Sequence, residues 1–101
     1  MGRPMSWASN YIIDLRAGKI VEFRPYGNSM DPLVKDNELV SVIPLGENAP
    51  EVGDIVLCTV GGCQYLHLVK AKNGDRYLIG NNRGGLNGWT NRKHVYGVVF
   101  R

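Results

Sequence analysis

Two glycines, Gly61 and Gly62, separate two runs of residues that favour β-structure, 54–60 and 63–72. A two-residue connection between antiparallel strands needs positive φ at its central positions, and glycine reaches that region at no steric cost. The glycine pair therefore predicts a tight hairpin, which fixes both the direction and the register of its two strands. This feature restricts the chain to a fold built on antiparallel β-structure.

Further short strands are predicted on both sides of the hairpin. Runs rich in β-branched and aromatic residues, bounded by turn residues, occur at 19–24, 37–44, 76–79 and 96–100. The composition of 46–53 is that of a loop, and 80–91 is expected to be an irregular loop. We therefore expect a mostly β domain of about six short antiparallel strands.

A short helix is predicted before the first strand, over residues 6–17. Ser6 can cap its start, and Gly18 stands where a helix commonly ends in a left-handed residue. Between them Trp7, Tyr11 and Leu15 recur at a four-residue interval, which places them on one face. The expected organisation is one domain overall, with a helical segment, 1–18, packed on the β domain, 19–101.

Composition excludes several classes of function. The chain has 101 residues, enough for one domain with a modest core, and 44% of them are hydrophobic, as in ordinary folded proteins. The net charge is +3, but cationic residues are scattered among acidic ones, which argues against a nucleic-acid partner. No run approaches the ~20 apolar residues of a membrane span, and no secretory leader is evident. The expectation is a cytoplasmic protein with no membrane partner.

The only cysteines, Cys58 and Cys63, do not indicate a metal centre. Their spacing matches no common zinc pattern, and only His67 and His94 could complete a set of four ligands. With one pair and no export signal, reduced thiols are expected. We predict neither metal nor cofactor.

One turn carries a candidate nucleophile, Ser29, within the sequence GNSMDP at 27–32. A serine hydroxyl attacks only with a base within hydrogen-bond reach and backbone donors for the oxyanion. Gly27 permits positive φ or close approach, Pro32 fixes the backbone after the turn, and Met30 can anchor it from below. Turns of this composition are also common on protein surfaces, so the six residues alone leave an ordinary surface turn as the alternative.

Two residues of the predicted strand 63–72 could supply the base, His67 and Lys70. Strand alternation places them on opposite faces, so both cannot serve one serine. A neutral imidazole accepts a proton near pH 7, whereas a lysine must first be desolvated. His67 is therefore the better candidate, with a half-buried strand histidine as the alternative.

Four motifs in order resemble the signal peptidase I and LexA-type serine peptidase superfamily. SMDP at 29–32 is similar to the nucleophile motif S-M-x-P, and NELVSV with VGDIVLC at 52–58 resembles the family's paired strands. YLHLVKA at 65–71 falls where these enzymes carry the general base. LIGNNRGGLNGW with VYGVV at 95–99 resembles the G-D-N box and the closing strand. The resemblance covers about residues 20–100.

The resemblance implies a LexA or signal-peptidase-like catalytic domain with Ser29 as nucleophile and His67 as base, as in the branch that uses histidine in place of lysine. The oxyanion hole is expected from the Ser29 amide and a backbone donor near Asn28. It would be built from backbone alone, since Gly27 stands where some bacterial members have a hydroxyl. The family's aspartates are replaced: one position is Asn81, and the second falls near Asn87 or Gly88.

The function expected from this resemblance is that of a soluble serine endopeptidase, such as a maturation or phage-encoded protease. Its partner would be a protein or peptide that binds by β-strand addition. The alternative, favoured by the missing aspartates, is a catalytically weak or inactive protein-binding or dimerisation module on the same fold. The two differ in whether Ser29 reacts with a serine-directed probe.

Overall fold

The glycine pair forms the expected hairpin in the computed structural model, which describes residues 6–100. Gly61 and Gly62 have φ values of 56° and 84°. They join β3 (Ile55–Val60) to β4 (Cys63–Asn73), paired without interruption from Ile55 opposite Leu68 to Val60 opposite Cys63. The prediction drawn from the two glycines is confirmed.

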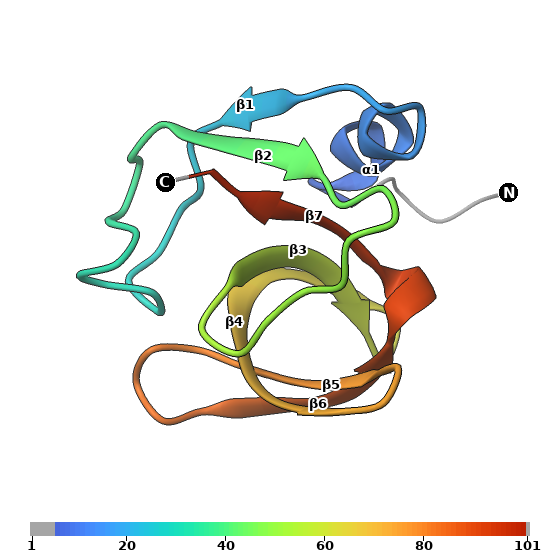
Figure 1. Ribbon diagram of the computed structural model, residues 1–101. Helices are drawn as coiled ribbons and strands as arrows, with labels where there is room; N and C mark the ends of the chain where they lie inside the picture. Colours follow the sequence, from blue (N-terminus) through green and yellow to red (C-terminus); the bar gives the residue numbers. More distant parts are fainter. Residues whose placement is uncertain (1–5, 101) are drawn as a thin grey trace, which may run out of the picture.

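The described residues contain one short helix and seven strands, all paired antiparallel in one sheet (Figure 1). The strand order is β1-β2-β7-β3-β4-β5-β6. Besides β3 and β4, the elements are α1 (Ser9–Arg16), β1 (Val21–Phe23), β2 (Val40–Pro44), β5 (Arg76–Gly80), β6 (Leu86–Asn91), a single 3-10 turn (Arg92–His94) and β7 (Val95–Val99). The expected mostly β fold with an N-terminal helix is confirmed.

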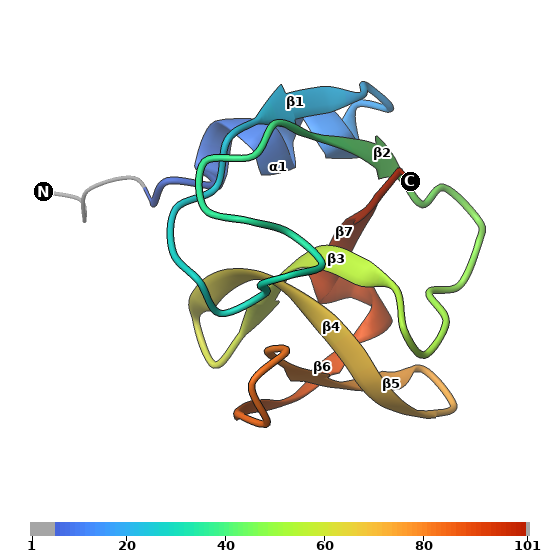
Figure 2. The same cartoon turned by 90° about the vertical axis from the view of Figure 1, so that its left-hand side faces the viewer.

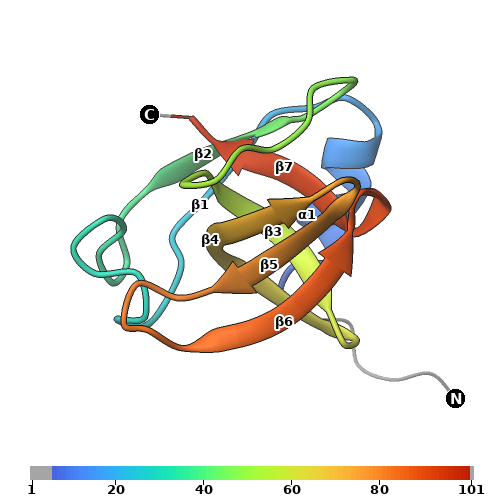
Figure 3. The same cartoon turned by 60° about the horizontal axis from the view of Figure 1, so that its bottom comes forward.

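The sheet bends strongly at β3, so that it has two hydrophobic cores. Alternate residues of β3 point to opposite sides: Ile55 and Leu57 join the core under α1, and Val56, Cys58 and Val60 join the other. Strands β3 to β6 curl like part of a barrel (Figure 1), and Figure 3 shows β4, β5 and β6 side by side in this part of the sheet. Five of the six β3 residues are buried, as expected for a strand covered on both faces.

The start of the helix and the structure of segment 80–91 differ from expectation. The helix begins at Ser9 with Ala8 at its N-cap position, so Ser6 is not the cap; its hydroxyl accepts a hydrogen bond from the Ala8 N–H at 3.3 Å. Segment 80–91 is not entirely irregular, because β6 forms within it and pairs with β5. Its glycines suggested a loop, but long-range pairing decides the structure there.

The ladder between β5 and β6 contains an irregularity that matters for the site. Ile79 pairs with Gly88 and Gly80 pairs with Leu86, so Asn87 is an extra residue without a partner. Gly88 has φ 130°, a value that L side chains rarely adopt. Such a β-bulge turns a side chain in a direction that a regular strand would not give it.

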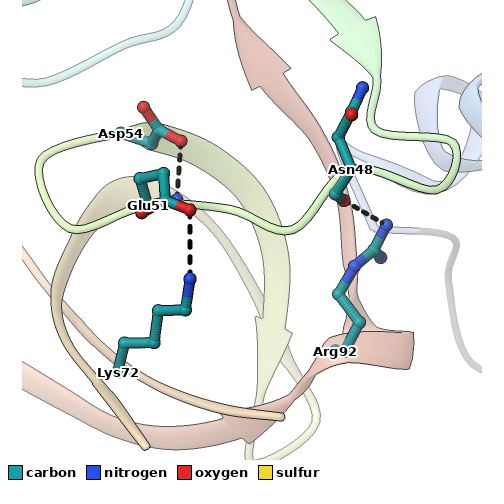
Figure 4. Close-up of polar contacts among 5 residues, drawn as sticks. All are labelled: Asn48, Glu51, Asp54, Lys72 and Arg92. Carbon is teal, nitrogen blue, oxygen red and sulfur yellow. Dashed lines mark hydrogen bonds and ion pairs between the residues drawn. The ribbon is translucent and has the colours of Figure 1, made fainter. Parts of the chain in front are cut away.

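The long connection between β2 and β3 is attached to the sheet by side-chain contacts (Figure 4). Glu51 Oε2 forms an ion pair with Lys72 Nζ at 3.0 Å, and the backbone N–H of Glu51 donates to Asp54 Oδ2 at 2.8 Å. Arg92 donates to the carbonyl of Asn48 at 3.0 Å. The loop expected at 46–53 is confirmed, and it lies outside the candidate site described below.

Within residues 6–100, no helix has the length and apolar character that crossing a membrane requires.

Candidate active site

Three residues from different parts of the chain meet in one hydrogen-bonded row. Ser29 lies in the connection between β1 and β2, which descends beside the sheet toward β4 (Figure 2). Its Oγ is 3.1 Å from Nε2 of His67 on β4. The other ring nitrogen, Nδ1, is 2.7 Å from Oδ1 of Asn87 on β6. Both distances are those of hydrogen bonds, so the imidazole bridges a hydroxyl and an amide.

The turn that carries Ser29 is held from both ends. Gly27 has φ 102°, and its N–H donates to Asp36 Oδ1 at 2.7 Å. The carbonyl of Ser29 accepts the N–H of Asn82 at 2.8 Å. Met30 is 4% exposed and packs in the core beneath the turn, as the sequence suggested. The turn is thus an ordered part of the structure rather than a free surface loop.

A second loop, 81–85, supports the Ser29 turn from the side. Arg83 Nε donates to the carbonyl of Asn28 at 3.0 Å, and Asn82 Nδ2 donates to the carbonyl of Asp31 at 3.0 Å. Asn81 shapes the loop itself, because its Oδ1 accepts the N–H groups of Arg83 and Gly85. Asn81 therefore acts on loop geometry and does not contact the imidazole.

The direction of donation in these two hydrogen bonds follows from the groups that flank the imidazole, the hydroxyl of Ser29 and the amide of Asn87. A serine hydroxyl donates to Nε2 only if that nitrogen is unprotonated, which leaves the proton of the neutral ring on Nδ1. Nδ1–H then donates to the carbonyl oxygen of Asn87. Burial of the half-buried ring lowers the pKa of His67 below 6.5, and the hydrogen bond to Asn87 opposes that shift. The neutral tautomer with Nε2 facing Ser29 is the one that a general base requires.

The residue that reaches the histidine, Asn87, is the extra residue of the bulge in β6, and its neighbour Gly88 has no side chain to offer. An amide at this position orients the ring as a carboxylate would, but it carries no charge to stabilise an imidazolium. The other predicted supporting residues lie around the turn: Pro32 is exposed and follows a cis peptide bond, and Asn28 is exposed with its carbonyl bound by Arg83.

Lys70 is the extra residue of a second bulge, in the ladder between β4 and β5. Val69 pairs with Ile79 and Ala71 pairs with Leu78, so Lys70 has no partner in β5. Its Cε lies beside Gly80. Of the two candidate bases, the one hydrogen-bonded to the hydroxyl of Ser29 is His67.

A cavity of about 410 Å³ opens beside Ser29 and His67. Its lining combines both of these residues with apolar and aromatic side chains, including Trp7, Tyr11, Phe23, Tyr26, Met30 and Leu66. A concave, mostly apolar site with a few polar groups at one end is the usual form of a ligand-binding pocket.

Sequence reasoning missed three contributors to this site. The four-residue spacing placed Trp7 and Tyr11 on one face of the helical segment but did not connect them with the site. Both line the cavity. Arg83 showed no signal beyond its place in a motif, although it links the two loops through Asn28.

The two cysteines are free thiols that lie away from the cavity lining. Burial raises the pKa of Cys58 to about 12, whereas Cys63 is exposed. Within the part of the chain that the structure describes, no three His, Cys, Asp or Glu side chains gather closely enough to hold a metal ion.

Comparisons of the chain with protein-family models, with curated proteins and with solved structures found no match.

Proposed function

We propose that this protein is a serine endopeptidase in which Ser29 is the nucleophile and His67 the general base. The observation that carries the proposal is the 3.1 Å contact between Ser29 Oγ and His67 Nε2 in the lining of a cavity of about 410 Å³. A nucleophile bonded to a base that a third group orients is the arrangement of covalent catalysis by serine.

In the proposed reaction, His67 Nε2 takes the hydroxyl proton as Ser29 Oγ attacks a peptide carbonyl. The imidazolium then gives that proton to the leaving amine, and water hydrolyses the acyl-enzyme with the same base. We assign the oxyanion hole to the backbone N–H of Ser29 and a neighbouring donor near Asn28. The Gly27 N–H is excluded from this role because Asp36 already accepts its hydrogen bond.

The edge of β4 supports binding of an extended peptide. Strand β5 pairs with β4 only from Leu68 onward, so residues 63–67 have β3 on one side and no strand of the described chain on the other. Val60 and Cys63 flank a two-residue turn and form its first hydrogen-bonded pair. By alternation, Gln64 and Leu66 turn their backbone groups toward the open edge, where they line the cavity.

A serine-directed fluorophosphonate probe tests this function. The wild type should be labelled at Ser29, and Ser29→Ala should not be labelled. His67→Ala should lower the labelling rate by roughly 10²–10⁴-fold, the usual contribution of a general base. Lys70→Ala is the matched control and should be labelled at the wild-type rate.

Two results would contradict the proposal. Absence of labelling between about pH 6 and pH 9 in a folded sample would favour the non-catalytic binding module, for which Asn87 in place of an acid is the supporting observation. Loss of labelling in Lys70→Ala, with His67→Ala unaffected, would transfer the role of base to the lysine. Circular dichroism of each variant shows whether it is folded.

A further inference from the structure

The cavity beside the dyad has an aromatic wall that comes mainly from the N-terminal helical segment. Tyr11 stacks on Phe23 with ring centroids 4.5 Å apart and planes 18° from parallel. Trp7 packs against the same Phe23 ring at 5.6 Å. Because each ring is held by another, the wall is formed before any ligand arrives.

The mouth of this cavity exposes large apolar side chains to water. Trp7 is 51% exposed and Tyr26 is 89% exposed, although both line the cavity. When an apolar group covers exposed aromatic surface around a concavity, removal of that surface from water is favourable. A ligand side chain that fills the cavity would therefore be large and apolar.

Charge in the lining restricts the ligand further. Among residues 6–100, Arg24 is the only lining residue with a permanent charge, and its Nη1 donates to the carbonyl of Asn37 at 2.9 Å. The described part of the lining holds no carboxylate, and its other basic residue, His67, is neutral above its lowered pKa. A lysine or arginine side chain would find no counter-charge there.

The same lining fixes where the apolar side chain lies along the peptide. Ser29 and His67 line the same cavity as Gln64 and Leu66, which lie on the open edge of β4. An extended peptide advances about 3.3 Å per residue. The side chain in the cavity therefore belongs to a residue within about three positions of the bond that Ser29 would attack.

We propose that this cavity is a specificity pocket for a large uncharged apolar side chain, aromatic or long aliphatic, and that Trp7 and Tyr11 of the helical segment form its recognising wall. The inference rests on the proposed function for the position of the cleaved bond. Recognition of the apolar side chain itself can be measured without catalysis.

Binding to Ser29→Ala tests recognition alone. Trp7 becomes the only tryptophan when Trp89, which lies on β6 outside the cavity, is replaced by Phe. Blocked heptapeptides that differ only in one central residue (Phe, Leu, Ala or Lys) are titrated against this double variant, and Trp7 fluorescence is followed. The Phe and Leu peptides should bind at least about tenfold more tightly than the Ala and Lys peptides.

Variants of one residue of the wall, Trp7, and one at the mouth, Tyr26, give the matched comparison, with dissociation constants measured by calorimetry in the Ser29→Ala background. Trp7→Ala and Tyr26→Ala should remove most of the preference for Phe over Ala, because both side chains are exposed and their loss leaves the core intact. Ile13→Ala is the control, since Ile13 lies on α1, is 60% exposed and is outside the cavity lining. It should retain the preference.

The outcomes separate this inference from the proposed function. Equal binding of the Phe and Ala peptides, preference for Lys, or no measurable binding at millimolar concentration overturns the pocket, whatever the reactivity of Ser29. Failure of fluorophosphonate labelling with the Phe preference intact overturns the peptidase and leaves the pocket as a peptide-binding site. If both succeed, mapped cleavage sites in a random peptide mixture should show large apolar residues within three positions of the cut.

Discussion

His67 is the residue on which the proposed chemistry depends most closely, because one ring contacts both the hydroxyl and the amide. Its Nε2 must be unprotonated to accept the proton of Ser29. Burial favours the neutral ring and lowers its pKa below 6.5, with the Asn87 hydrogen bond acting in the opposite direction. The imidazole is thus neutral over a wider pH range than that of a free histidine.

The pH dependence of labelling follows from that shift. The rate should be constant near pH 7 and above and fall as pH drops through the lowered pKa of His67, so its midpoint should lie below 6.5. Rates of fluorophosphonate labelling between about pH 4.5 and 8, with folding checked at each pH, measure it. A midpoint well above 6.5 would contradict the assignment of burial as the dominant influence.

Stability should respond to the same residue. Between the lowered pKa of the folded state and the value near 6.5 of the unfolded chain, the unfolded state binds more protons. The contribution of His67 to the free energy of unfolding is therefore largest above about pH 6.5 and decreases as pH falls through this range.

Replacement of Asn87 by Asp should make the site more reactive. A carboxylate at 2.7 Å from Nδ1 would stabilise the imidazolium that forms during attack and raise the pKa of His67. The reverse change in a serine protease triad costs about 10⁴-fold, so a gain of at least tenfold in labelling rate is expected for Asn87→Asp.

The matched control for this prediction is Asn81→Asp, which places the same carboxylate in loop 81–85, where it does not contact the ring. It should leave the midpoint of the pH profile near that of the wild type. An Asn87→Asp variant with an unchanged rate and an unchanged midpoint would show that the amide does not orient the base in solution.

At the scale of elements, the site depends on two loops that support each other. Arg83 in loop 81–85 donates to the carbonyl of Asn28, immediately before the nucleophile. Arg83 is exposed, so its removal changes little of the buried surface.

Arg83→Ala should lower the rate of Ser29 labelling several-fold while the free energy of unfolding changes by no more than about 0.5 kcal/mol. Lys19→Ala, another exposed cation, is the control and should change neither quantity. Chemical denaturation and labelling kinetics on the same samples measure the two effects. A large loss of stability in Arg83→Ala would assign the residue to folding rather than to positioning.

Elements with a clear local pattern were predictable from the sequence, and the one strand whose local composition indicates a loop was not. Gly61 and Gly62 fixed a hairpin whose register involves neighbouring residues. Strand β6 was missed because Gly85 and Gly88 suggest a loop until β5 pairs with the segment. Both Asn81 and Asn87 were candidates for supporting His67, and their hydrogen bonds in the folded chain distinguish them: Asn87 bonds to the ring and Asn81 to its own loop.

At the scale of the whole molecule, the candidate site joins the two halves of the bent sheet. Phe23 and the aromatic side chains of the helical segment belong to the half built by β1, β2 and β7, whereas His67 and Asn87 come from the curled half. Ser29 lies on the connection that passes between them (Figure 2). The side chains that line the cavity therefore come from both halves, with Gln64, Leu66 and His67 from the curled one.

The position of β7 between β2 and β3 affects the order in which the sheet can assemble during synthesis. During synthesis β2 and β3 are made long before β7, yet each pairs with it, and they do not pair with each other. The strand pairing that connects β2 to β3 can form only after Val95–Val99 has been synthesised. A nascent chain that already contains Ser29, His67 and Asn87 therefore still lacks the strand that pairs with both β2 and β3.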